Sequence, residues 1–168
     1  MATTIAVLSQ KGGTGKTTLT RTLSDVFGRL GLEVLAIDAD PQGNLSDYFD
    51  TDPDAQPTLA EVLQGQVRAA DAVHGAVIPA NMRTKHARQT LEALRSRFGD
   101  RVCRSVIRQS IAYAESAERA IPILDYRPDR GADYLSLAGE LLRRLGRYEL
   151  LEPLDRLSAE VVPAGARA

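Results

Sequence analysis

The chain has 168 residues, 43% hydrophobic and 26% charged, which is the size and composition of one ordinary globular domain and not of a disordered or fibrous protein. Its net charge of −1 argues against a protein that coats nucleic acid over its whole surface. A single cysteine, no apolar run of about 18 residues, and no signal-peptide pattern predict a cytoplasmic protein with no disulfide, membrane span or membrane partner.

The first predicted elements form one βαβ unit. Ile5–Leu8 is a short apolar run that ends in a glycine-rich loop. Residues 17–30 then place their apolar side chains three or four positions apart, as on one face of a helix. Gly31 is the residue type that commonly ends a helix in the left-handed conformation. The apolar run Val34–Asp38 is too short for a helix and is typical of a buried parallel strand.

Later segments continue this alternation. Thr58 and Glu61 have the spacing of a capping box, which predicts a short helix that stops by Gly65. Alternating strands and helices, without repeats, predict a single α/β domain over residues 1–168 with a mostly parallel sheet. Further helices are predicted over 84–98, 112–119 and 133–145, short strands over 77–79, 102–107 and 121–125, and a frayed tail over 163–168.

The segment from Gln10 to Thr18 carries the clearest functional signal. Its glycines let successive backbone N–H groups point into one concavity, and the following helix adds its positive end, so the segment suits a phosphate. In such a loop Lys16 reaches the β and γ phosphates and the Thr17 hydroxyl joins the shell of a Mg²⁺ ion. The alternative is a structural glycine turn that precedes a helix. The predicted ATP-binding residues are Lys11, Gly12, Gly13, Thr14, Gly15, Lys16, Thr17 and Thr18.

This loop departs from the ordinary G-x-x-x-x-G-K-[ST] pattern. Gln10 stands where the first glycine is expected, and Lys11 adds a second lysine. The resulting pattern, K-G-G-x-G-K-T-T, resembles the deviant phosphate loop of the ParA/Soj chromosome- and plasmid-partition ATPases, relatives of MinD and the nitrogenase iron protein. Residues 34–44, VLAIDADPQGN, resemble the second-strand motif of that family. The C-terminal part resembles it more loosely, at 83–88, 98–99, 106–108, 114–115, Tyr134 and 140–142.

The resemblance implies a P-loop-type three-layer fold and a role for several residues. Lys11 corresponds to the lysine that crosses to the partner's nucleotide in the family's ATP-bound dimer, and Lys11, Lys16 and Asp40 form the implied catalytic set. Asp40 corresponds to the carboxylate that orients the attacking water or the water shell of the metal. The metal candidates are Thr17, Asp38 and Asp40, with a purely structural hydrogen bond as the equal alternative for Asp38. The alternatives for Lys11 and Asp40 are a solvated loop lysine and an Asx turn.

One element of the family is not found. A P-loop ATPase needs a carboxylate at the end of a third apolar strand, where it holds the magnesium waters. The other apolar run that ends in Asp, 120–125, contains a proline and lies where the family has a C-terminal loop. A middle section on the order of 60–100 residues is therefore predicted to be absent near residue 81, which reduces the number of strands. The remaining pieces would close into a smaller sheet or bury their faces against another chain.

A basic stretch follows this break. Residues 83–108 carry 8 basic and 2 acidic side chains, a net charge of +6. This charge fits the nonspecific DNA-binding surface of partition ATPases, and the alternative is a solvated helix face on an arginine-rich chain. The DNA-binding candidates are Arg83, Lys85, Arg88, Arg104 and Arg108.

Two functions follow from the resemblance. The first is a ParA-like ATP-binding protein of chromosome or plasmid partition that hydrolyses ATP weakly if at all. It would dimerise with nucleotide, bind DNA nonspecifically in the cytoplasm or on the nucleoid, and meet a ParB-type centromere-binding protein. The second is a non-catalytic nucleotide-binding remnant or regulatory module that binds a ParA-type partner without turnover.

Overall fold

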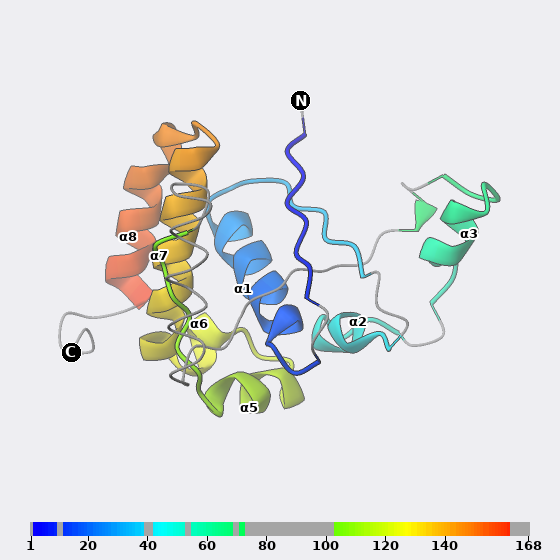
Figure 1. Ribbon diagram of the computed structural model, residues 1–168, viewed down its shortest axis with the longest axis horizontal. Coiled ribbons are helices and arrows are strands. Elements are labelled where there is room, and N and C mark those ends of the chain that lie inside the picture. The colour runs from blue at the N-terminus through cyan, green and yellow to red at the C-terminus, as the bar shows by residue number, and fades with distance from the viewer. Residues whose placement is uncertain are drawn as a thin grey trace.

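The computed structural model describes residues 2–9, 12–38, 42–52, 55–68, 71–72 and 103–161, and within them the chain is helical. Figure 1 shows α7 and α8 side by side at one end, α1 next to them, and α3 set apart at the other end. No helix in the described part of the chain is long and apolar enough to cross a bilayer. The helices are α1 (Lys16–Arg29), α2 (Asn44–Tyr48), α3 (Leu59–Leu63), α5 (Ala112–Glu118), α6 (Ile123–Tyr126), α7 (Pro128–Arg144), the 3₁₀ helix η3 (Tyr148–Leu150) and α8 (Leu151–Val161).

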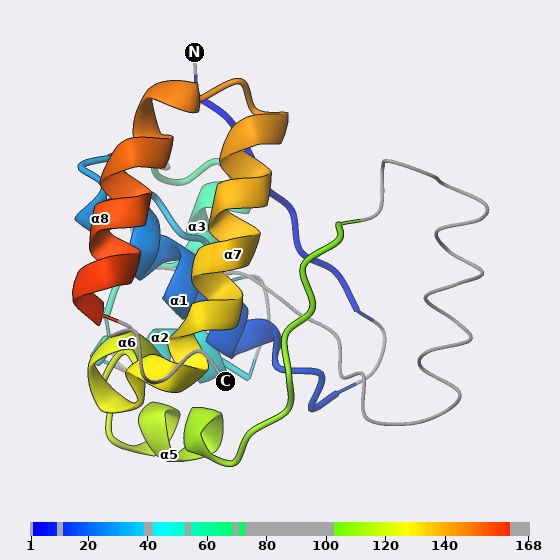
Figure 2. The same ribbon diagram turned by 90° about the vertical axis from the view of Figure 1, so that its left-hand side faces the viewer.

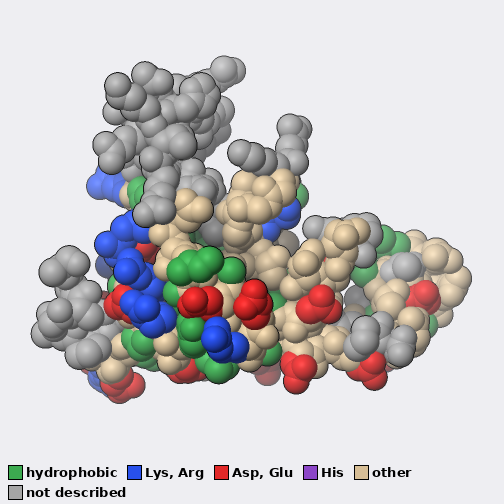
Figure 3. Space-filling view, turned by 90° about the horizontal axis from the view of Figure 1, so that it is seen from below, with side chains coloured by type: hydrophobic (Ala, Val, Ile, Leu, Met, Phe, Trp, Pro, Cys, Tyr) green, Lys and Arg blue, Asp and Glu red, His purple; other side chains and the backbone are tan. Residues whose placement is uncertain are grey.

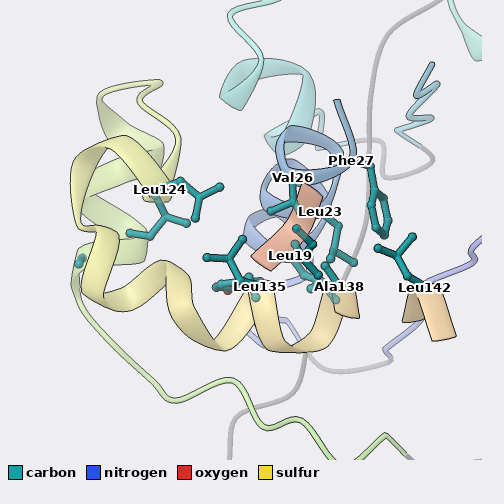
Figure 4. Close-up of a cluster of buried hydrophobic side chains, with 12 residues drawn as sticks. Leu19, Leu23, Val26, Phe27, Leu124, Leu135, Ala138 and Leu142 are labelled. Carbon is teal, nitrogen blue, oxygen red and sulfur yellow. The ribbon is translucent and has the colours of Figure 1, made fainter. Parts of the chain in front are cut away.

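Helix α7 is the centre of the fold, because it packs against α1, α6 and α8. Its first turn contains Pro128, whose missing N–H is not needed there, and Asp129, whose charge suits the positive end of the helix. Arg143 and Arg144 suit the negative end in the same way. The buried core, shown in Figure 4, combines Leu19, Leu23, Val26 and Phe27 of α1, Ala112 of α5, Ile123 and Leu124 of α6, Tyr134, Leu135, Ala138 and Leu142 of α7, and Leu154 of α8.

The helix predicted over 17–30 is confirmed as α1. Its buried residues recur three and four positions apart, which places them on the face that meets α7. Gly31 ends the helix with a φ of 80°, and the N–H of Leu32 donates to the carbonyl of Phe27 at 3.0 Å. This is the hydrogen-bond pattern of a left-handed helix end, as predicted.

Three further predicted helices are confirmed. At the start of α3 the N–H of Thr58 donates to the Glu61 carboxylate at 2.7 Å, so the capping box is present. The helix predicted over 112–119 is α5, and the one predicted over 133–145 is the later part of α7. The predictions over 77–79, 84–98 and 163–168 lie outside the described residues.

The predicted parallel sheet is wrong, since none of the described residues lies in a strand. The predicted α/β fold class and the predicted three-layer P-loop arrangement with few strands are therefore also wrong for the described residues, which form helices and irregular segments. An apolar run becomes a strand only when a neighbouring strand supplies partners for its backbone. The runs 5–8 and 34–38 adopt no regular structure, and Val34, Leu35 and Ile37 remain 42%, 57% and 54% exposed. An apolar run alone was therefore not enough to predict a strand. The smaller sheet expected from the sequence does not form among the described segments.

Segment 103–110 contains the described part of the strand predicted over 102–107, and side chains take the place of a strand partner there. The segment runs along α7 (Figure 2), and the N–H groups of Arg104 and Ser105 donate to Glu140 at 2.8 and 2.9 Å. The N–H of Arg108 donates to Asp133 at 2.9 Å. Because these amides already have carboxylate acceptors, the segment is anchored to a helix and not to a sheet.

The strand predicted over 121–125 is also wrong, because most of it forms α6. Pro122 precedes this helix with a φ of −55°, close to the value that its ring imposes and that a helix start accepts. Ile123 and Leu124 are 0% and 2% exposed within the helix. The periodicity of a short buried apolar run fits a strand and a helix equally well. Here Pro122 favours the helix, because proline suits the start of a helix and cannot donate a hydrogen bond within a sheet.

Gly131 allows α6 and α7 to approach closely. A Cβ at this position would lie 2.5 Å from Cδ2 of Leu124, a side chain that is only 2% exposed. We expect Gly131→Ala to lower the free energy of unfolding by about 1–3 kcal/mol, because the buried leucine must move within a packed core. Urea unfolding measures this change.

Gly28 provides the matched control for this prediction. It lies in the last turn of α1, and a Cβ there would meet no atom within 4 Å. Gly28→Ala should leave stability unchanged or raise it by about 0.5 kcal/mol, since alanine has the higher helix propensity. Equal losses in the two variants would contradict the close contact at Gly131.

Candidate functional site

The loop before α1 is shaped by two left-handed glycines. Gly13 and Gly15 have φ values of 69° and 79°, a region that residues with side chains rarely adopt. Gly12 is exposed, and a Cβ on Gly12 or Gly13 would meet no atom within 4 Å. Glycine is therefore required at position 13 for its left-handed backbone conformation and not to avoid a steric clash. The loop borders open space.

The N-terminus of α1 follows this loop directly. Lys16 is its first residue, no side chain caps the helix, and no acidic residue lies in its first turn. The N–H groups of Lys16, Thr17 and Thr18 have no acceptor within the helix and lie at the positive end of its dipole. This arrangement of amides suits an anion.

A cavity of about 530 Å³ lies over this end of α1. One wall is Gly13–Thr18, and the facing wall is Ile107–Ser110 together with Tyr113 of α5. Asn44, the first residue of α2, also lines it. We call this space the phosphate-loop cavity; its volume is that of a site for a small organic ligand.

Arg108 is fixed in the wall of the phosphate-loop cavity by Asp133. Its Nη2 and Nε atoms donate to the Asp133 carboxylate at 3.0 and 3.1 Å, and these hydrogen bonds raise the pKa of Arg108. Arg108 is one of the predicted DNA-binding residues, and the structure pairs its charge and places it beside the phosphate loop. Arg104, the other described DNA candidate, is exposed, and its backbone N–H donates to Glu140.

Two tyrosines line the phosphate-loop cavity near Arg108. The rings of Tyr113 and Tyr134 meet edge to face, with centroids 5.5 Å apart and planes at 87°. Burial raises the pKa of Tyr113 to about 12, so its phenol is neutral at physiological pH, and it donates to the carbonyl of Arg130 at 3.2 Å. A neutral aromatic wall suits apolar contact with a planar ligand.

Asp38 holds the start of α2. Its Oδ2 accepts the N–H groups of Leu45 and Ser46 at 3.2 and 3.1 Å, and the Ser46 hydroxyl at 3.2 Å. Gly43, which precedes α2, has no side chain to cap the helix, so the carboxylate of Asp38 supplies the cap. The structural hydrogen-bonding role, one of the two alternatives predicted for Asp38, is therefore present.

The structure brings only part of the predicted site together. Thr17 is half-buried in the cavity wall and Thr18 is 8% exposed. Within the described segments, no group of three or more His, Cys, Asp and Glu residues gathers to hold a metal. Cys103 is half-buried, and burial raises the pKa of its thiol, which argues against a thiolate nucleophile. Lys11, Asp40, Arg83, Lys85 and Arg88 lie outside the described residues.

Several residues of the phosphate-loop cavity were not predicted from the sequence as site residues. Asn44, Gln109, Tyr113 and Tyr134 line the phosphate-loop cavity, and each belongs to a segment with no recognisable spacing toward residues 13–18. The run Val-Ile-Arg at 106–108 contributed to the family resemblance, but it did not indicate that these residues lie opposite the glycine-rich loop. Its place opposite the loop depends on how α5 and α7 pack, which periodicity does not encode.

Charges of both signs lie close together on the molecular surface. Figure 3 shows acidic side chains beside basic ones on the face seen from below. Ion pairs such as Arg127 with Asp129, at 2.9 Å, and Arg130 with the same carboxylate, at 3.1 Å, bring opposite charges together. Such pairing makes the electrostatic potential of the surface less positive than the number of arginines alone would predict.

Comparison with known proteins points to one family. Residues 5–123 match a family model described as the CobQ/CobB/MinD/ParA nucleotide binding domain. The chain is 40% identical over 76 residues to the chromosome partitioning protein ParA of Caulobacter vibrioides and 38% identical over 73 residues to the chromosome-partitioning ATPase Soj of Thermus thermophilus. It is 39% identical over 82 residues to a putative replication protein A of Rhizobium rhizogenes. These alignments cover 45%, 42% and 45% of this chain but only 28%, 29% and 20% of the relatives.

Proposed function

Because the chain belongs to the CobQ/CobB/MinD/ParA nucleotide-binding family, we propose that its phosphate-loop cavity binds ATP together with Mg²⁺. The family match agrees with the resemblance of the K-G-G-x-G-K-T-T loop to ParA and Soj. One observation carries the proposal. The uncapped N-terminus of α1 opens from the left-handed Gly13 and Gly15 into a cavity of about 530 Å³.

Each residue of the loop has a defined part in this proposal. The amides of residues 13–18 hold the phosphates, and the ammonium of Lys16 contacts the β and γ phosphates. The Thr17 hydroxyl would join the shell of the magnesium ion, which would supply positive charge beside the phosphoryl oxygens. Lys11 and Asp40 keep the roles that the resemblance implies, toward the partner's nucleotide and toward the attacking water.

The facing wall would hold the rest of the nucleotide. Tyr113 offers an aromatic surface and Gln109 an amide, which suit a planar base and its polar edge. Arg108, oriented by Asp133, adds a fixed positive charge beside the phosphates. Asp38 acts indirectly, because its hydrogen bonds to α2 hold Asn44 at the edge of the cavity.

The proposal extends to chromosome or plasmid partition. It describes one domain, residues 1–168, that dimerises with ATP, binds DNA nonspecifically and meets a ParB-type protein in the cytoplasm or on the nucleoid. The names of the ParA and Soj relatives support this role. The matched part of the chain nevertheless spans less than a third of the length of these relatives. Membership of the family therefore does not by itself assign the activity of the whole relatives to this chain.

Calorimetric titration of the folded protein with Mg·ATP and Mg·ADP tests the central proposal. We expect saturable binding of both nucleotides, and a folded sample that takes up neither would contradict it. Phosphate release then separates an ATPase from a module without turnover. Turnover that is lost in Lys16→Ala and Asp40→Ala supports the ATPase, whereas no release by the wild type supports the non-catalytic module.

DNA binding is tested by a gel shift with ATP at low and moderate salt. We expect Arg104→Gln to lower the slope of log K against log salt by about 1, as for the loss of one phosphate contact. Arg156→Gln, which changes an exposed arginine outside residues 83–108, is the control and should leave the slope unchanged. Binding that is absent or insensitive to salt would remove DNA from the proposal.

A further inference from the structure

A second cavity, of about 690 Å³, lies along α1 and shares no described lining residue with the phosphate-loop cavity. We call it the α1 cavity. Its floor is one face of α1, where Arg21, Ser24 and Gly28 recur three and four positions apart. Its walls are the extended segment 32–36 and Phe49, which directly follows α2.

Arg21 is a preorganised cation in the α1 cavity. Its guanidinium carbon lies 4.4 Å from the ring centroid of Phe49 and 5.9 Å from that of Tyr48, so the aromatic rings fix its position. No carboxylate of the described residues forms an ion pair with it. Asp25, the acidic residue nearby in the lining, is 3.1 Å from Nε of Arg29, and Arg29 also contacts Asp125 at 2.6 Å. Arg21 therefore makes no ion pair with the described residues, and the one carboxylate of the described cavity lining is paired with Arg29.

Three buried polar atoms of the lining make no hydrogen bond with the described residues. One is the acceptor Oδ2 of Asp25, which belongs to the ion pair with Arg29, and the other two are the donors Nε of Arg21 and Oγ of Ser24. A buried polar group without a partner is unfavourable, so such atoms need an explanation. Both donors belong to the same face of α1, and an oxyanion placed between them would accept from both. A planar guanidinium held by stacking is the side chain best suited to a carboxylate or phosphate group.

The rest of the α1 cavity is apolar and open. Val34 and Leu35 line it and are 42% and 57% exposed. Gly28 leaves part of the floor empty, since a Cβ there would meet no atom within 4 Å. The cavity thus joins an anion-binding end to an apolar wall, within the volume range of small-ligand sites.

We propose that the α1 cavity binds a small organic anion, a carboxylate or phosphate group carried on a flat apolar body, at Arg21 and Ser24. This site is separate from the nucleotide site and does not depend on it. The anionic group would pair with the guanidinium of Arg21, and the apolar body would cover Val34 and Leu35. Burial of that body removes apolar surface from water, which favours binding.

Titration of the full chain with three naphthalene probes tests the proposal. We expect 2-naphthoate or 2-naphthyl phosphate to bind, and the stronger of the two identifies the anionic group. 2-Naphthylmethanol, which has the same body without charge, should bind at least tenfold more weakly. Failure of both anions to bind at millimolar concentration, or equal binding of the uncharged probe, would overturn the proposal.

Variants place the probe in the α1 cavity. Arg21→Met should weaken anion binding at least tenfold, and Gly28→Leu should block it by filling the open floor. The control is Arg119→Met, because Arg119 also stacks on an aromatic ring, that of Tyr126 at 5.1 Å, but does not line the α1 cavity. Equal losses in Arg21→Met and Arg119→Met would contradict the site. Displacement of the probe by Mg·ADP would assign it to the phosphate-loop cavity and also overturn the proposal.

Discussion

Lys16→Ala is expected to weaken binding of Mg·ATP by on the order of 10- to 100-fold. The variant loses one charged donor to the phosphates, worth roughly 1.5–3 kcal/mol, and each 1.4 kcal/mol corresponds to about tenfold in affinity. The amides of the loop and of the first turn of α1 remain in place, so some affinity should persist. Calorimetric titration of wild type and variant measures the difference.

The choice of nucleotide provides an internal control for this prediction. Lys16 is proposed to contact the β and γ phosphates, so the loss should be large for ATP and small for AMP. Stability should change little, because position 16 is the first residue of a helix and not part of the buried core. An equal loss for AMP and ATP would show that the substitution disturbs the loop and does not remove a phosphate contact.

Glu140→Gln is expected to lower the free energy of unfolding at neutral pH by on the order of 2 kcal/mol. The carboxylate accepts the N–H groups of Arg104 and Ser105 at 2.8 and 2.9 Å, the Ser105 hydroxyl at 2.9 Å and Nη2 of Arg144 at 2.8 Å. Burial alone would raise the pKa of Glu140, but these hydrogen bonds outweigh it and lower the pKa to about 2. A neutral amide cannot replace a charged acceptor of so many donors.

The effect of Glu140→Gln should depend on pH in a defined direction. The pKa of Glu140 is lower in the folded state, so its contribution is fully present above its ordinary value of 4.5 and is lost as the pH falls toward about 2. Urea unfolding at pH 7, 4 and 3 should therefore show the difference between wild type and variant shrinking with acid. Glu152→Gln is the control, because that carboxylate is 76% exposed and pairs only at the surface with Arg156. A difference that does not change with pH would contradict the assignment.

Helices and the phosphate loop could be predicted because their signals are local. The apolar spacing in 17–30, the glycine at 31 and the Thr58–Glu61 pair each determine structure within a few residues, and each is found as predicted. Family membership was also readable, since the loop motif is contiguous. These features require no knowledge of distant partners.

Strands could not be predicted in the same way, because a strand exists only with a neighbour. Val34–Asp38 has the composition of a buried strand, but no described segment pairs with it, and its larger apolar side chains, Val34, Leu35 and Ile37, remain exposed. In segment 103–110, Glu140 and Asp133 take the backbone N–H groups that a sheet would have used. These acceptors lie 25 to 36 residues away along the chain, beyond the reach of a pattern argument.

The far wall of the phosphate-loop cavity was unpredictable for the same reason. Tyr113 and Arg108 line the same cavity as residues 13–18 only because α5 packs against α6 and α7 packs against both α6 and α1. The sequence predicts Arg108 as part of a DNA-binding stretch because its neighbours in the sequence are basic. Its ion-pair partner, Asp133, is distant in sequence, so the pairing could not be predicted in the same way.

The described buried residues of the core cluster come from two stretches of sequence, residues 19–27 and residues 112–154, and Leu30, Leu32 and Ile107 of the intervening chain pack against them. Evolution can therefore lengthen or shorten the polypeptide between residues 32 and 107 without removing any side chain of this cluster. Such insertions and deletions cost little through chain entropy, since doubling the length of a connecting loop adds only about 0.6 kcal/mol. A lineage could thus trim the middle of its gene while the hydrophobic framework behind the glycine loop persists.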